Sequence, residues 1–193
     1  MPVPPRPPPP SFKSSVPLPR PKPPIVAPNG PPGALLVELN TYSGSPFNDH
    51  WAYFVRSSQD LDVGVVFEAV GDVRTGFKLE IERNYSFALA SSPIATRVPL
   101  QWIDAKYVDE KAMLDNGNSA VVDDPICIFE ECLRKVKVPE ETLNNIEKTN
   151  TPAKRVVQRN CQTWIVEAAD QLVRDGIFNP DVAAYLHGVK QCR

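Results

Sequence analysis

Hydrophobic and polar residues alternate over several short stretches after residue 33, a pattern that is typical of β-strands. The clearest case is residues 77–82, where Phe77, Leu79 and Ile81 point to one side and the charged residues between them point to the other. Pro99 lies inside the last predicted strand, which indicates an edge position or a bulge because proline donates no ladder hydrogen bond. The predicted strands, about five in number, cover residues 34–42, 50–56, 64–71, 76–85 and 97–105.

The apolar spacing then becomes helical. The pairs Asp124–Pro125 and Asn179–Pro180 are helix start signals, and Gly176 is a stop signal. The predicted helices cover residues 124–137, 139–148, 160–176 and 179–188. Strands that precede helices in this way favour an α+β domain, in which the helices pack on an antiparallel sheet.

The first 33 residues have a different composition, because they contain 15 of the 22 prolines. Proline fixes φ and has no donor, so this segment is predicted to be a disordered, partly polyproline tail, followed by one domain over residues 34–193. The tail contains PxxP cores without a flanking basic residue at the usual SH3-ligand offset. A semi-rigid tether and a ligand for an SH3 or WW partner are both open interpretations.

Charge and cysteine content limit the partners, the compartment and the metal sites that can be expected. The net charge is −2, and the tail carries four basic residues and no acid, so residues 34–193 carry −2 − (+4) = −6. An acidic domain argues against nucleic-acid binding. No apolar run approaches the length of a membrane span, and no signal peptide is recognisable, so we expect a cytoplasmic protein with reduced thiols. The four cysteines and two histidines fit no zinc spacing, and no metal or cofactor is expected.

Cys161 is placed at the start of the predicted helix 160–176, with Asn160 as its N-cap. The unpaired amides and partial positive charge of a helix N-terminus favour a thiolate, and they can also receive an oxyanion. A free cysteine that simply fills the core is the alternative, and position alone does not exclude it.

His50 and Glu68 lie on consecutive predicted strands. If the hairpin turns near residues 59–60, residue 50 lies across from residues 68–70, and period-two alternation makes His50 and Glu68 neighbours. Glu68 stands in a strand that is apolar on both faces, where a carboxylate needs a partner. A carboxylate that orients an imidazole is what a catalytic base requires, but a structural histidine beside a glutamate that turns to the sheet edge is also open.

Three segments in this order, residues 50–55, 64–71 and 160–166, resemble the circularly permuted papain-like superfamily of NlpC-type thiol enzymes. The similarity is greatest to the lecithin:retinol acyltransferase-like and PPPDE-type branch, and the layout also resembles a group of small fungal proteins. In that branch a histidine opens a strand, a polar residue follows on the next strand, and the cysteine comes last at a helix start. The resemblance spans roughly residues 35–175 and implies a permuted papain-like fold.

Two features depart from that branch. It usually has a second histidine where this chain has Glu68, and its lipid-modifying members carry a C-terminal hydrophobic anchor that is not seen here. The resemblance therefore implies a cysteine-dependent hydrolase acting on an amide, isopeptide or thioester bond of a protein or a small acyl compound. An acyltransferase and a catalytically inactive interaction module with a recruiting tail are the alternatives. The implied catalytic residues are Cys161, His50 and Glu68, and the residues supporting the oxyanion are Asn160, Gln162 and Gln158.

The remaining candidates receive structural interpretations. His187 lies in the last turn of the final helix, where a cation is favourable. Trp51 and Trp164 are next to the candidate residues, and we expect them to pack the helix onto the sheet rather than to bind substrate. Glu80 and Glu82 occupy the polar face of their strand and are expected to be solvated.

Overall fold

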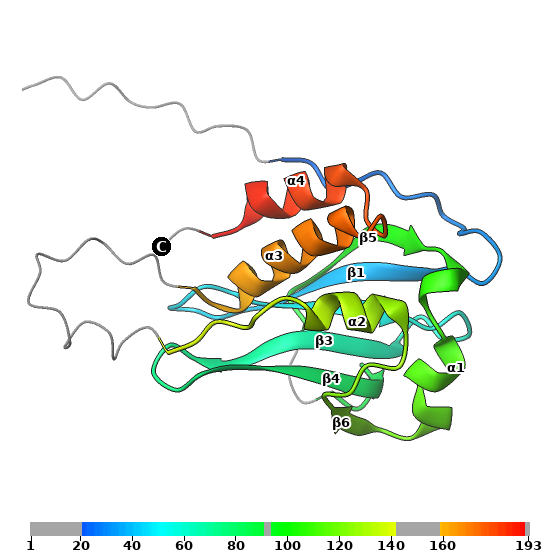
Figure 1. Cartoon of the computed structure of the whole chain (residues 1–193), viewed down its shortest axis with the longest axis horizontal. Coiled ribbons are helices and arrows are strands. Elements are labelled where there is room, and N and C mark those ends of the chain that lie inside the picture. The colour runs from blue at the N-terminus through cyan, green and yellow to red at the C-terminus, as the bar shows by residue number, and fades with distance from the viewer. Residues whose placement is uncertain (1–20, 91–93, 142–158, 192–193) are drawn as a thin grey trace, which may run out of the picture.

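A computed structural model describes residues 21–90, 94–141 and 159–191 of the chain. In these ranges the protein is an α+β domain with one antiparallel six-stranded sheet of order β5-β1-β2-β3-β4-β6 (Figure 1). The strands are β1 Leu35–Tyr42, β2 His50–Arg56, β3 Val63–Asp72, β4 Gly76–Ser86, β5 Thr96–Ile103 and β6 Ala120–Val122. The helices are α1 Glu110–Met113, α2 Ile128–Arg134, α3 Cys161–Arg174 and α4 Pro180–Val189, with 3₁₀ turns at Ala105–Tyr107 and Asp115–Gly117.

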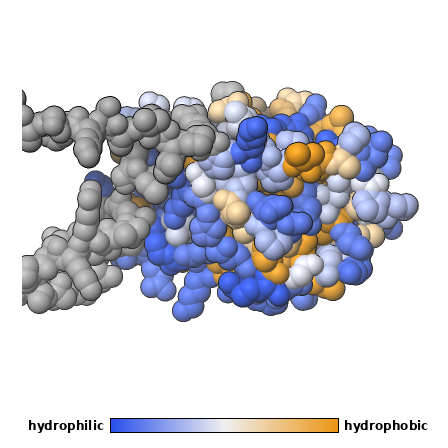
Figure 2. Space-filling view, turned by 90° about the horizontal axis from the view of Figure 1, so that it is seen from above, coloured by the Kyte–Doolittle hydropathy of each residue, from blue (hydrophilic) through white to orange (hydrophobic). Residues whose placement is uncertain are grey.

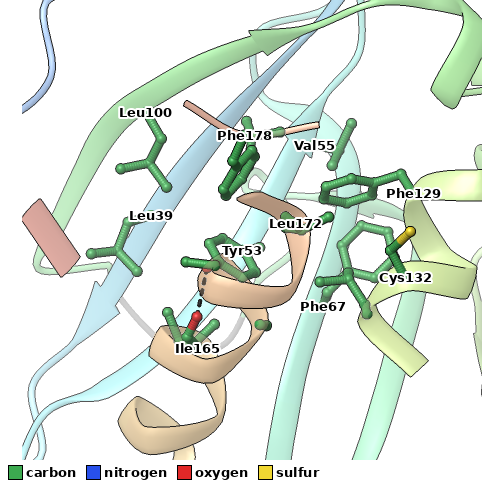
Figure 3. Packing of buried hydrophobic residues seen from close by; sticks show 14 of the residues in the cluster. Leu39, Tyr53, Val55, Phe67, Leu100, Phe129, Cys132, Ile165, Leu172 and Phe178 are labelled. Carbon is green, nitrogen blue, oxygen red and sulfur yellow. Dashed lines mark hydrogen bonds between the residues drawn. The ribbon is translucent and has the colours of Figure 1, made fainter. Parts of the chain in front are cut away.

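Helices α2, α3 and α4 lie together on one face of the sheet (Figure 1). Alternate residues of the central strands point toward them and form the main core, in which Tyr53, Phe67, Phe129 and Trp164 are fully buried. The Tyr53 hydroxyl donates a 2.7 Å hydrogen bond to the backbone oxygen of Ile165, so β2 is tied directly to α3 (Figure 3). Helix α3, which begins at Cys161, is therefore fixed to β2, which begins at His50, by packing and by a buried polar contact.

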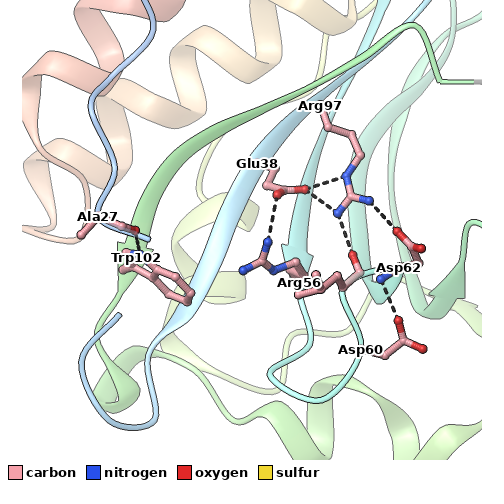
Figure 4. A network of polar contacts seen from close by, with 8 residues as sticks. Ala27, Glu38, Arg56, Asp60, Asp62, Arg97 and Trp102 are labelled. Atoms are coloured by element: carbon pink, nitrogen blue, oxygen red, sulfur yellow. Dashed lines mark hydrogen bonds and ion pairs between the residues drawn. The ribbon is translucent and has the colours of Figure 1, made fainter. Parts of the chain in front are cut away.

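The opposite face of the sheet has its own smaller apolar cluster, which consists of Ala52, Phe54 and Val66 covered by aromatic side chains. Beside it Glu38, which is only 4 % exposed, forms ion pairs with Arg56 and Arg97 (Figure 4). Both faces of the central strands are thus covered, as the apolar residues on both sides of β3 predicted.

Helix α3 begins and ends where the sequence predicted. The Asn160 side chain accepts from the Thr163 N–H while the Thr163 hydroxyl accepts from the Asn160 N–H, which is a capping box. Gly176 has φ +72, a left-handed conformation that ends the helix. Trp164 is 0 % exposed on the sheet-facing side of this helix, and Trp51 is also buried, so both tryptophans have the packing role expected of them.

The expectations for β5 are confirmed and the strand number is corrected. β5 is an edge strand, and its pairing with β1 shifts at Pro99, because Val37 pairs with Gln101 and Glu38 pairs with Pro99. The sixth strand, β6, pairs with β4 and has three residues, which is too short to show alternation.

Helix α2 begins at Ile128 rather than at the predicted Asp124–Pro125 signal. The reason is a contact distant in sequence: the carboxylate of Glu130 accepts from the Ile126 N–H and from Arg83, whose guanidinium also donates to the Asp124 backbone oxygen. These bonds hold residues 124–127 out of the helix. In the predicted helix 139–148, residues 139–141 are not helical and the rest lies outside the described residues.

The predicted tail is corrected for its last part, residues 21–33. This segment has no helix or strand, but it packs on the domain: Trp102 donates through Nε1 to the backbone oxygen of Ala27 at 2.8 Å (Figure 4). Residues 1–20 lie outside the described part.

The face seen from the α4 side is mostly polar, with separate apolar patches (Figure 2). Across the described ranges, no helix has the length and apolar character that crossing a bilayer requires.

Candidate active site

His50 is the first residue of β2, and its imidazole lies against the carboxylate of Glu68 on β3. Nε2 of His50 is 2.5 Å from Oε2 of Glu68. Glu68 pairs directly with Ala52, so the contact with His50 runs diagonally along one face of the hairpin. The His50 and Glu68 side chains are 34 % and 21 % exposed, so solvent screens their interaction less than it screens a surface ion pair. The sequence expectation that these residues are neighbours is met.

Cys161 is the first residue of α3 and is 8 % exposed. Its side chain lies close enough to the His50 imidazole for hydrogen bonding and charge to act on the pKa of His50. Burial by itself would lower the pKa of His50, but the hydrogen bonds to Cys161 and Glu68 and the negative charges of both groups outweigh burial and raise this pKa from 6.5 to about 10. The arrangement therefore favours an imidazolium at His50.

Cys161 lies in the first turn of α3, where backbone N–H groups have no partner within the helix. The capping box uses the Thr163 N–H, and Trp164 N–H bonds to the Asn160 backbone oxygen. Within the described residues, no acceptor is present for the N–H groups of Cys161 and Gln162, as expected for the first turn of a helix. The N–H groups of Cys161 and Gln162 can therefore donate hydrogen bonds to a negatively charged oxygen atom of a molecule bound beside the thiol.

The Gln162 side chain does not have the oxyanion role expected of it. The residue is fully buried, and both hydrogens of its amide nitrogen are used, one by the backbone oxygen of Asp49 at 2.7 Å and one by Oε1 of Gln191 at 2.9 Å. No hydrogen remains to bind a substrate oxygen. Gln158 lies outside the described residues. The Asn160 side chain is the N-cap, with its oxygen held by Thr163.

Acidic and aromatic side chains flank the His50–Glu68 pair on the same sheet face. The Tyr42 ring is 5.9 Å from the His50 ring and tilted by 41°. Burial raises the pKa of Tyr42 well above its usual value, so its hydroxyl stays neutral. Burial and then the charges of Glu68 and Glu80 also raise the pKa of Glu82. Glu82 is therefore partly buried rather than simply solvated.

Sequence reasoning missed three neighbours of the site, Tyr42, Asp49 and Gln191. Tyr42 pairs directly with His50 across the β1–β2 hairpin, and a register for that hairpin would have indicated it. Asp49 precedes His50, but nothing local distinguishes it from other loop carboxylates. Gln191 carries no sequence signal at all.

The other cysteines and the second histidine lie elsewhere. Burial raises the pKa of Cys127 and of Cys132 to about 11, so both are poor nucleophiles near neutral pH, and Cys192 is outside the described part. His187 is held by both carboxylate oxygens of Asp170 at 3.0 Å, which agrees with a structural role. In residues 21–90, 94–141 and 159–191 no three metal-binding side chains come together.

Comparison with protein-family models places the chain in a family. Residues 37–179 match the model of a family of unknown function, DUF6540, and the chain belongs to that family. The matched range contains His50, Glu68 and Cys161 but ends before Gln191. Comparison with curated proteins and comparison with solved structures gave no match.

Proposed function

We propose that this member of DUF6540 is a cysteine-dependent hydrolase of the permuted papain-like type, which cleaves an amide, isopeptide or thioester bond. The observation that carries the proposal is the chain of contacts from Cys161 to His50 and from His50 to Glu68. A nucleophile hydrogen-bonded to a base, with the base oriented by a third group, is the arrangement that nucleophilic catalysis requires.

The chemistry assigned to each side chain follows from these contacts. Nε2 of His50 is engaged by Glu68, so Nδ1 is the nitrogen that takes the proton of the Cys161 thiol. The thiolate attacks the substrate carbonyl, and the N–H groups of Cys161 and Gln162 receive the oxyanion. When the C–N or C–S bond breaks, the His50 imidazolium gives its proton to the leaving group, and an acyl-Cys161 thioester remains.

Water then completes the reaction. With His50 neutral again, Nδ1 takes a proton from a water molecule as its oxygen attacks the thioester. The sulfur leaves, and the proton passes back to it as the carboxylic acid is released. Glu68 touches neither reactant; it positions the imidazole and stabilises its positive charge.

The order of elements supports the permuted papain-like assignment as part of the same proposal. The histidine opens β2, its polar partner is on β3, and the cysteine starts the late helix α3 that packs on the sheet (Figure 1). Glu68 takes the position of the second histidine, and a carboxylate is able to orient imidazole in that place.

Alkylation of Cys161 as a function of pH tests the proposal. Cys161 is only 8 % exposed, so the test uses iodoacetamide, a probe small enough to reach it. The labelled peptide is quantified by mass spectrometry. An ion-paired thiolate should react rapidly below about pH 7, whereas an ordinary thiol reacts slowly below about pH 8. Cys127 and Cys132 are internal controls that should stay unlabelled near neutral pH.

The matched variant is His50→Ala, which should restore the slow, ordinary profile. Native protein given p-nitrophenyl acetate should also release a burst of p-nitrophenol and carry one acetyl group on Cys161. A native profile equal to that of His50→Ala, with no acetyl-Cys161, would instead favour the non-catalytic interaction module.

A further inference from the structure

A cluster of three residues, Asp49, Gln162 and Gln191, joins the two halves of the proposed site, and we name it the amide clamp. Asp49 immediately precedes His50, Gln162 immediately follows Cys161, and Gln191 lies two residues beyond the end of α4. The clamp therefore connects the segments that carry the imidazole and the sulfur through a third segment that carries neither.

Five hydrogen bonds hold the amide clamp together. Two of them join the Gln191 side chain to Asp49: Oε1 accepts from the Asp49 N–H at 2.7 Å, and Nε2 donates to Oδ2 of the Asp49 carboxylate at 2.8 Å. Between the two glutamines, the Gln191 N–H donates to Oε1 of Gln162 at 2.9 Å, and Nε2 of Gln162 donates to Oε1 of Gln191 at 2.9 Å. The fifth bond joins Nε2 of Gln162 to the Asp49 backbone oxygen at 2.7 Å.

The geometry of these bonds limits how the two reacting groups can move. The Asp49 backbone oxygen and the His50 N–H belong to one peptide unit, so the bond from Gln162 fixes the plane from which the imidazole projects. Gln162 is fully buried and one residue after the nucleophile, so its side chain cannot shift without the first turn of α3. Asp49 is held a second time by the Gly44 N–H at 3.2 Å.

We infer that Gln191 is a positioning residue for the proposed thiol chemistry, acting through the amide clamp to hold Cys161 and His50 in hydrogen-bonding contact. The inference rests on the proposed function. Gln191 itself touches neither reacting group, and it lies beyond residues 37–179, which match the family model. The clamp thus joins two residues of the matched range, Asp49 and Gln162, to one residue outside it.

The test is the pH profile of iodoacetamide alkylation of Cys161 in the full-length Gln191→Ala protein. This change removes the three bonds made by the Gln191 side chain and leaves the other two, one from the Gln191 backbone and one between Gln162 and Asp49. A loosened imidazole should lower the alkylation rate near about pH 6.5 by roughly ten- to a hundredfold, because small misplacements have effects of that order. At about pH 9.5, where ordinary thiols ionise, the rate should match that of the native protein.

The matched control is Gln101→Ala. Gln101 makes a similar two-point tether at the other end of α4, donating to the Ile177 backbone oxygen at 2.8 Å and accepting from the Asn179 N–H at 2.7 Å. It should leave the alkylation profile unchanged even where it lowers the thermal midpoint. Gln191→Glu replaces the donor to the Asp49 carboxylate with a second carboxylate, and the repulsion between them should lower the rate at least as much as Gln191→Ala does.

Two results would overturn the role of Gln191 while leaving the proposed function standing. One is a Gln191→Ala profile equal to the native profile, when His50→Ala differs from both. The other is faster alkylation of Gln191→Ala at every pH, which would mean local opening rather than loss of positioning. A native profile equal to His50→Ala has a different meaning, because it removes the proposed function and the clamp's role with it.

Discussion

Nε2 of His50 and Oε2 of Glu68 lie 2.5 Å apart across the β2–β3 hairpin, although the direct pairing partner of Glu68 is Ala52. The diagonal contact is possible because residues two apart on a strand share a face. It commits one imidazole nitrogen to a carboxylate and leaves the other for the sulfur of Cys161. The charge on the imidazole therefore depends on both of these neighbours.

Glu68→Gln should lower the pKa of His50 from its value of about 10, because the amide keeps the hydrogen bond but removes the negative charge that favours the imidazolium. NMR titration of the ring protons measures this directly. Glu80→Gln, on the neighbouring strand and facing Glu68, is the control and should have a smaller effect. An unchanged His50 titration in Glu68→Gln would mean that the carboxylate does not act on the imidazole.

The same raised pKa makes the stability of the protein depend on pH. A histidine whose folded pKa is about 10 and whose ordinary value is 6.5 contributes stability that is fully present below pH 6.5 and is lost as pH rises toward 10. The difference in free energy of unfolding between native and His50→Gln proteins should therefore shrink over this range. Denaturant titrations at several pH values measure it, with His187→Gln as the control for the second histidine. A difference that stays constant from pH 6.5 to 10 would contradict the assignment.

Much of the fold can be predicted from local pattern. Alternation predicts that Phe77, Leu79 and Ile81 share one face, which proves to be the face toward the helices. Pro99 predicts an edge position or a bulge, and its strand has both. Asn160 predicts the start of α3. Each of these depends on a residue and its nearest neighbours in sequence, where chain geometry leaves few options.

The features that sequence reasoning missed depend on contacts between distant segments. The start of α2 is moved by Arg83, which is 47 residues from Glu130, and Gln191 reaches Asp49 across 142 residues. The free Gln162 amide expected for an oxyanion is consumed by that same distant partner. No periodicity encodes which polar side chains meet, because hydrogen-bond partners are chosen by the assembled tertiary structure.

Removing one partner of the buried ion pair between Arg83 and Glu130 should lower the free energy of unfolding much more than replacing both partners together. Both guanidinium nitrogens reach the carboxylate at 2.9 Å, and the side chains are 5 % and 0 % exposed. Glu130→Ala leaves a buried unpaired charge and should cost about 3–5 kcal/mol of unfolding free energy.

The double variant Arg83→Met with Glu130→Leu is the matched comparison, and it should lose much less than the single change because no charge is left unpaired. Urea unfolding of the native, single and double variants closes the cycle. A double variant as unstable as Glu130→Ala would show that the bonds to the Asp124 backbone oxygen and the Ile126 N–H matter more than the charge.

Asn160→Asp should separate the stability of α3 from the reactivity of Cys161. Aspartate is as good an N-cap as asparagine, so the bond from Thr163 N–H is kept and the thermal midpoint should hold or rise. The added negative charge lies one residue from the sulfur and disfavours the thiolate, so alkylation near about pH 6.5 should slow several-fold. Asn179→Asp makes the same change at the N-cap of α4 and should leave alkylation as it is. Equal alkylation in native and Asn160→Asp proteins would mean that a negative charge at the N-cap does not act on the Cys161 thiolate, and the ion-pair description of the site would have to be abandoned.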